Sequence, residues 1–182
     1  DANTDLINLL EQLSFEYDCS AFWSILNPLI KLYYHFKQKH RGISGFGEGT
    51  AKLPFLPYYP AYEDWQSKGF ARKILEIPMP RTKIFALPFY QNFHLSAGEF
   101  YRKFAVSSMQ QPYFVFLFHL IEFVGLEDGL PRELAIHPNL AKPASSKIES
   151  MRETIRTLKK RYQVVRTVDF VKDFKLRHGQ NK

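Results

Sequence analysis

The sequence PYFVFLFHLIEF, residues 112–123, says more about the fold than any other part of this chain. A proline and a run of apolar and aromatic residues lead directly to His119. A continuous apolar run of this length predicts a strand buried on both faces, as in the middle of an α/β domain. His119 then falls where the strand leaves the core, which is where open sheets and barrels bind ligands. A histidine at a strand end is also commonly a satisfied core residue, so the run alone leaves both interpretations open.

Length and composition are those of one globular domain. The chain has 182 residues with 45% hydrophobic and 24% charged residues, so we expect residues 1–182 to form a single domain. Residues 21–70 are rich in aromatic residues, proline and glycine and are expected to form an irregular insertion. No apolar stretch is long enough for a membrane span, and the first residues do not resemble a signal peptide. The single cysteine, Cys19, leaves the compartment open, with a cytoplasmic or membrane-peripheral location favoured.

The net charge of +7 is spread along the chain. Its denser basic stretches, residues 31–41, 147–161 and 172–182, are interpreted as solvated helix faces. Nucleic acid is not expected as a partner, because zinc-finger spacing, a basic-region heptad and an RNA-binding aromatic motif are all missing. Anionic sugars, lipid phosphates or peripheral contact with a membrane surface fit the charge better.

The order of predicted elements indicates an α/β fold with a parallel sheet. The predicted helices are 5–13, 96–106 with a Ser96–Glu99 capping box, one beginning at a Ser146–Glu149 capping box, and 169–176. The predicted strands are 15–18, 73–78 with an extension at 82–85, 113–119 and 162–167. The aromatic stretch 21–36 is expected to pack over the sheet, with a lid or membrane-touching segment as the alternative.

Four pieces of sequence, in this order, resemble the C-terminal half of the polysaccharide deacetylases, the NodB-homology carbohydrate esterases. They are LLEQLSFEYDCS at 9–20, ILEIPM at 74–79 followed by LPF at 87–89, LFH at 117–119, and the closing unit at 147–174. They resemble, respectively, the family's helix and Gly-Phe-x-Tyr-Asp-Ser-Ser step, its Leu-x-Glu-Ile-Pro strand, its Leu-x-His catalytic motif and its final helix–strand–helix unit.

The resemblance implies a distorted (β/α) barrel that removes an N-acyl group, acetyl or formyl, from a polysaccharide or a lipid-linked sugar. A divalent metal such as zinc would polarise the acyl carbonyl and activate water. His119 would be the catalytic acid that protonates the departing amine, and Leu117 would help to form an apolar pocket for the acyl methyl group.

The chain departs from the family pattern in one important respect. The family's Asp-Asp strand end, its His-x3-His metal pair and its Arg-x-Pro segment would all precede Asp1, and the sequence contains no His-x3-His. We therefore expect the metal ligands and the general base to lie outside this chain, in an N-terminal half of the domain that is part of a longer protein or a separate chain. The alternative is a non-catalytic carbohydrate-binding or scaffold protein on a truncated or degenerate deacetylase fold.

Four further residues are candidate substrate-binding residues. Glu122 lies three residues after His119 and would orient it, although a solvent-facing acid is equally consistent with the sequence. Asp18 ends the first predicted strand on the same rim. Trp65 would stack on a sugar ring unless it packs on the sheet, and His94 would line the groove unless it is a surface loop residue. His137 and His178 are interpreted as surface residues.

Overall fold

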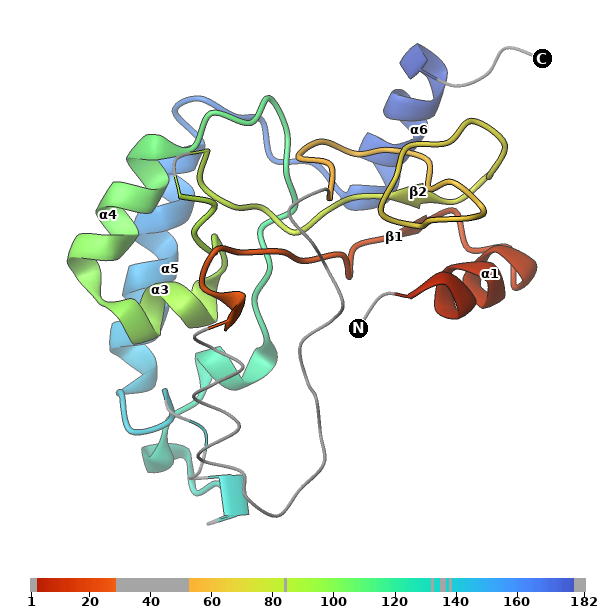
Figure 1. Cartoon of the computed structure of the whole chain (residues 1–182). Helices are drawn as coiled ribbons and strands as arrows, with labels where there is room; N and C mark the ends of the chain where they lie inside the picture. Colours follow the sequence, from red (N-terminus) through yellow and green to blue (C-terminus); the bar gives the residue numbers. More distant parts are fainter. Residues whose placement is uncertain are drawn as a thin grey trace.

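The computed structural model describes residues 3–28, 53–83, 85–131, 133–134, 137 and 139–178 (Figure 1). These residues form a mixed helical and sheet structure, so the expectation of an α/β protein is confirmed at this coarse level. The α-helices of this part are α1 (Thr4–Gln12), α3 (Gln91–Ala97), α4 (Glu99–Ser108), α5 (Ala144–Leu158) and α6 (Thr167–His178). Two short 3₁₀ turns, η1 (Leu120–Phe123) and η2 (Leu126–Asp128), connect the middle of the chain to α5.

The sheet is a short parallel pair. β1 (Tyr17–Asp18) lies in register with β2 (Leu75–Glu76), and the pairing continues past the strand ends, where the Met79 amide donates to the Ala21 carbonyl over 2.8 Å. On its other edge β2 forms an antiparallel bridge with Tyr58. Since β2 has a neighbour on each side, both of its residues are fully buried.

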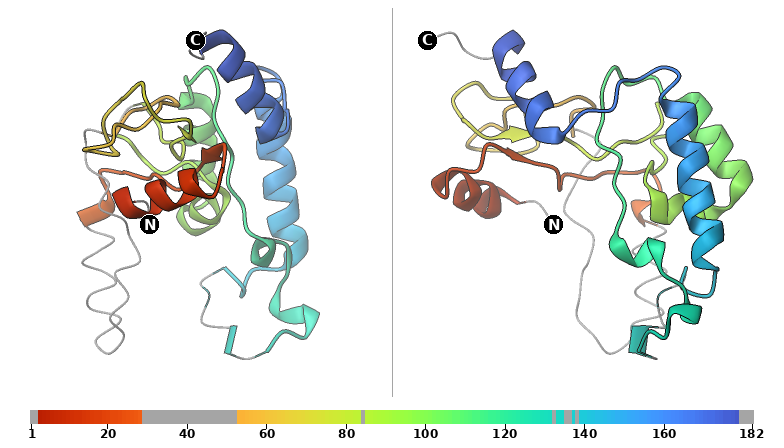
Figure 2. Two further views of the ribbon diagram at one scale, coloured as in Figure 1. Left: turned by 90° about the vertical axis from the view of Figure 1, so that its right-hand side faces the viewer. Right: turned by 180° about the vertical axis from the view of Figure 1, so that it is seen from behind.

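The helices gather in two groups around this pair. α3, α4 and α5 lie together on one side, while α1 and α6 lie on the other side close to β1 and β2 (Figure 1). The view from behind shows residues 113–119 running between the two groups and leading into η1 (Figure 2). The core accordingly divides into three clusters, one under α1, one among α3–α5 and one between the strands and α6.

Residues 113–119 are extended but are not part of a strand in the described chain. Phe114 and Phe116 pack against the cluster among α3–α5, whereas Tyr113 and Val115 pack against the cluster between the strands and α6. The side chains therefore alternate between two cores, as those of a strand between two layers would. The prediction of a fully buried strand is wrong, because these residues are only partly buried.

Four further sequence predictions are corrected by the structure. Gly98, at φ 89°, ends α3 and precedes α4, so the proposed Ser96–Glu99 capping box is split between two helices. α5 begins at Ala144 directly after Pro143, two residues before the proposed Ser146 cap. Residues 162–166 form an irregular connection instead of a strand, and β2 is shorter than predicted.

The insertion at 21–70 is described only in part. Residues 53–70 form an irregular loop closed by an antiparallel bridge between Pro60 and Lys68, while residues 29–52, and with them the second half of the aromatic stretch 21–36, lie outside the described residues. Among the described residues, no helix has the length and apolar character needed to cross a membrane.

Candidate active site

The candidate site begins where the extended segment 113–119 ends. Its position is fixed from α3, because the Gln91 amide donates to the Leu117 carbonyl over 3.0 Å. Phe116, one residue earlier, is anchored against Phe89, with ring centroids 5.6 Å apart. His119, two residues after Leu117, has 56% of its side chain exposed. The packed segment before it thus positions the imidazole of His119 at the surface.

His119 is paired with Glu122. Its Nδ1 lies 3.2 Å from Glu122 Oε1, and the chain bends into η1 so that the two residues, three apart, meet. Because an ionised carboxylate can only accept, the contact favours the tautomer with the proton on Nδ1 and leaves Nε2 to interact with a ligand. The alternative that Glu122 is a solvent-facing acid is wrong, since only 1% of its side chain is exposed.

Burial raises the pKa of Glu122, while the hydrogen bond with His119 and the positive charge of Lys147 oppose that rise. Lys147 comes from α5 and is itself buried. Its Nζ donates to the carbonyl of Val124 and, over 3.1 Å, to the carbonyl of Asn139. Burial lowers the pKa of Lys147, and nearby carboxylates, Glu122 among them, act against that change. Through Lys147, α5 therefore places a positive charge near Glu122. The same side chain holds the loop between η1 and α5 by its hydrogen bonds to Val124 and Asn139.

A second histidine belongs to this neighbourhood. His137 Nδ1 is buried and has no hydrogen-bond partner among the described residues, and the pKa of His137 is lowered by its burial and by the positive charges of Lys147 and His119. His137 as a whole is half-buried, so its interpretation as a surface residue holds only in part. Lys147 likewise departs from the expected solvated basic face, since it is 1% exposed. The sequence did not indicate the burial of His137 or of Lys147, because both depend on how α5 packs against η1.

The other candidate residues lie elsewhere. Asp18 is on β1 beside Glu76, and β1 and η1 lie apart in every view (Figures 1 and 2). Trp65 is 4% exposed and belongs to the core cluster under α1, which leaves no free face for a sugar. His94 is in α3, not in a loop, and is 1% exposed among aromatic rings. Of the predicted set, the structure brings together Leu117, His119 and Glu122.

The described residues do not offer a metal site of their own. Among them, no three histidine, cysteine, aspartate or glutamate side chains are close enough together to hold a metal ion. The residues described here therefore do not fit the divalent metal that the resemblance implies, and no chemical step is assigned to such an ion. No protein-family model, no curated protein and no solved structure matches this chain.

Proposed function

We propose that this chain is the C-terminal part of a deacetylase-type (β/α) barrel and that it provides the general acid for hydrolysis of an N-acylated sugar. The observation that carries the proposal is the His119–Glu122 pair: an exposed imidazole held through Nδ1 by a buried carboxylate. This is the arrangement needed for a histidine that works through its other nitrogen.

Amide hydrolysis needs such a group. The C–N bond of the tetrahedral intermediate breaks with its electron pair moving to nitrogen, and an amide anion is too basic to leave without a proton. A protonated His119 would donate from Nε2 to that nitrogen and become neutral as the amine departs. Glu122 would hold the ring plane, and Leu117, anchored through its carbonyl, would lie beside the acyl group. The metal ligands and the general base remain expected outside this chain.

The surroundings of His119 support an extended or lipid-linked substrate. Phe118 is 46% exposed and Leu120 84% exposed, so His119 is flanked along the chain by two apolar residues at the surface. Such residues pack on the apolar faces of sugar rings or on a lipid tail.

The proposal is tested with the protein expressed from its gene, assayed with added Zn²⁺ on two substrates. One is an N-acetylglucosamine oligomer, whose amine needs protonation, and the other is 4-nitrophenyl acetate, whose phenolate does not. His119→Ala should lower turnover of the oligomer by about 10²–10⁴-fold and leave the ester nearly unchanged. His178→Ala, a surface change on α6, is the matched control and should alter neither rate.

An equal loss on both substrates, or no loss, would contradict the acid role of His119. Saturable binding of the oligomer without any turnover by the wild-type protein would instead support the non-catalytic carbohydrate-binding alternative.

A further inference from the structure

Two carboxyl groups face each other at the ends of the parallel strands. Asp18 closes β1, Glu76 closes β2, and the two residues are directly opposite in the ladder. Glu76 is completely buried, and its side chain lies within hydrogen-bond distance of the Asp18 carboxyl group. If both carboxyl groups were ionised, the two negative charges would repel strongly, because the groups are adjacent and Glu76 has no access to water.

Hydrogen-bond donors of the described chain reach only some of the carboxyl oxygens of Asp18 and Glu76. Glu76 Oε1 accepts from the Ala21 amide over 3.1 Å, and Asp18 Oδ2 accepts from the Ser20 hydroxyl over 2.5 Å. Glu76 Oε2, in contrast, is buried and has no donor among the described residues. An orphaned carboxylate oxygen beside a second carboxyl group is satisfied if one proton lies between the two.

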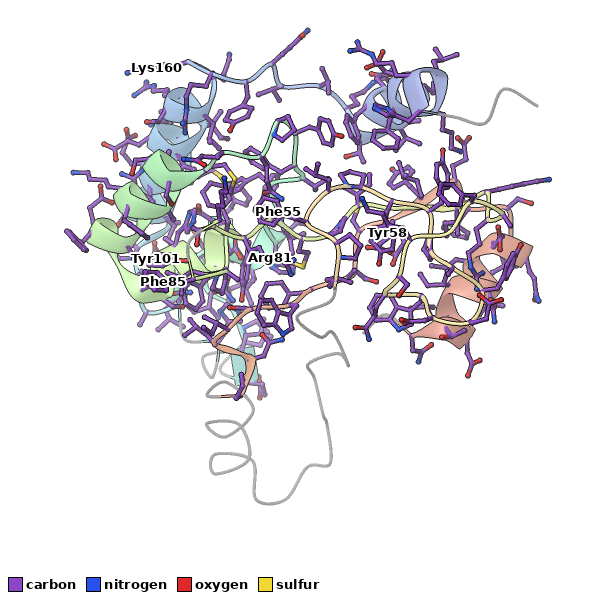
Figure 3. All side chains as sticks on the ribbon, turned by 45° about the horizontal axis from the view of Figure 1, so that its top comes forward. Phe55, Tyr58, Arg81, Phe85, Tyr101 and Lys160 are labelled. Atoms are coloured by element: carbon purple, nitrogen blue, oxygen red, sulfur yellow. The ribbon has the colours of Figure 1, made fainter. Side chains whose placement is uncertain are left out.

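The other ionisable groups nearby do not supply a positive charge to the pair. Cys19 and Tyr58 lie close enough for the negative charge of Glu76 to raise the pKa of both, after burial as the main cause; the pKa of Cys19 rises to about 12. Arg81, which lies next to Phe55 (Figure 3), instead donates to the carbonyls of Leu53 and Trp23. The environment of Glu76 therefore favours its neutral form.

We infer that Asp18 and Glu76 share a single proton in the folded protein and that this proton fastens the carboxyl ends of β1 and β2 together. The proton lies between the carboxyl groups of Glu76 and Asp18, while Glu76 Oε1 accepts from the Ala21 amide and so holds the chain that leaves β1. Loss of the proton places two negative charges at the strand ends and loosens this connection. The inference is independent of the proposed function.

A shared proton gives a definite pH dependence. The unfolded chain releases the Glu76 proton near the ordinary pKa of a glutamate, about 4.3, whereas the folded protein keeps it to higher pH. Above that value the folded state binds one more proton than the unfolded state, so stability falls as the pH rises, until the folded protein also loses the proton. The contribution to the folding equilibrium constant is a tenfold decrease per pH unit.

The test measures unfolding by chemical denaturation of the 182-residue chain between pH 5 and 8, in wild type and in Glu76→Gln. Glutamine has the shape of a protonated glutamate, and its amide can donate to Asp18 permanently. The ratio of the folding constants, variant over wild type, should therefore rise with pH from pH 5, by up to about tenfold per pH unit, until the folded wild-type protein releases the proton. Glu63→Gln, a nearby exposed change, should give a ratio that does not vary with pH.

A pH-independent ratio for Glu76→Gln would overturn the inference. So would a wild-type stability at pH 8 that rises with Mg²⁺ or Ca²⁺ while that of Glu76→Gln does not, since a cation would then occupy the place of the proton. If Glu76→Gln does not fold, infrared difference spectroscopy of the wild-type protein decides: a protonated-carboxyl C=O band that persists at neutral pH supports the shared proton, and its absence refutes it.

Discussion

The buried ring of His94 leads to a specific prediction. Within the described part of the chain, neither ring nitrogen has a hydrogen-bond partner, and the ring lies against Phe89, Phe116 and Tyr101 with centroids 4.9, 5.7 and 5.9 Å away. Burial, with the charge of Arg102 as a smaller cause, lowers the pKa of His94 from 6.5 to about 4. The folded protein thus keeps this imidazole neutral in mildly acidic solution.

The magnitude follows from that difference. Between about pH 6.5 and 4 the unfolded chain binds a proton that the folded chain does not, so His94 makes stability fall as the pH falls. The free energy of unfolding loses about 1.4 kcal/mol per pH unit, about 3 kcal/mol over the whole interval. His94→Leu puts an apolar group of similar size in the same site and removes this loss. At pH 7 the variant should be as stable as wild type within about 1.5 kcal/mol.

The assay is urea denaturation of both proteins at several pH values from 7 to 4. The matched control is Gln91→Leu on the same helix, since Gln91 is also 1% exposed and its side-chain amide has no hydrogen-bond partner among the described residues, but it does not titrate. Its difference from wild type should be constant with pH, while that of His94→Leu should move by about 3 kcal/mol in favour of the variant on acidification. A constant difference for His94→Leu, or a large loss at pH 7, would refute the reasoning.

Three other predictions concern packing and the support of the candidate site. Lys147→Met leaves the partly buried Val124 carbonyl without its Lys147 donor and removes one of the two donors to the Asn139 carbonyl, so it should cost about 1–3 kcal/mol in urea denaturation; it should also raise the pKa of His137, followed by NMR titration, and an unchanged titration would contradict the charge coupling. Phe89→Ala empties a fully buried position and should cost about 3–5 kcal/mol, whereas Phe100→Ala, 88% exposed, should change stability by less than about 0.5 kcal/mol; similar losses would be inconsistent with the core assignment. Gly69→Ala would place a Cβ 2.7 Å from the backbone of the facing loop and should cost about 1–3 kcal/mol, and a neutral result by thermal unfolding would speak against that close approach.

The sequence predicted the local elements well where their signals were self-contained. The first helix was expected at 5–13 and is observed at Thr4–Gln12, because its leucine spacing and its cap are local; the Leu6 amide donates to Asn3 Oδ1 over 2.7 Å. The two strands that pair in parallel were also expected, although β2 is shorter than predicted. Apolar content and turn residues are sufficient to identify such elements.

Features that depend on tertiary packing could not be predicted in the same way. The apolar run 113–119 carries the residue types of a buried strand, yet whether it pairs depends on neighbours that its own sequence does not specify. The two predicted capping boxes do not form for a local reason. The carboxylate of Glu99 binds Arg102 and that of Glu149 binds Arg152, so neither carboxylate caps the backbone of the serine three residues before it. The supporting role of Lys147 follows from the packing of α5 against η1, which no short motif encodes.

The central claim is that Nδ1 of His119 is held by Glu122 so that Nε2 is the reactive nitrogen. The most direct measurement is ¹⁵N NMR of the histidine side chains in wild type and in Glu122→Leu, which removes the carboxylate from its buried position. The account predicts that neutral His119 in wild type has its proton on Nδ1 and that the variant shifts toward the Nε2-protonated form common in free imidazole side chains. If the neutral wild-type ring has its proton on Nε2, or if the variant leaves the tautomer of the neutral ring unchanged, the proposed acid is not held as described and the claim is contradicted.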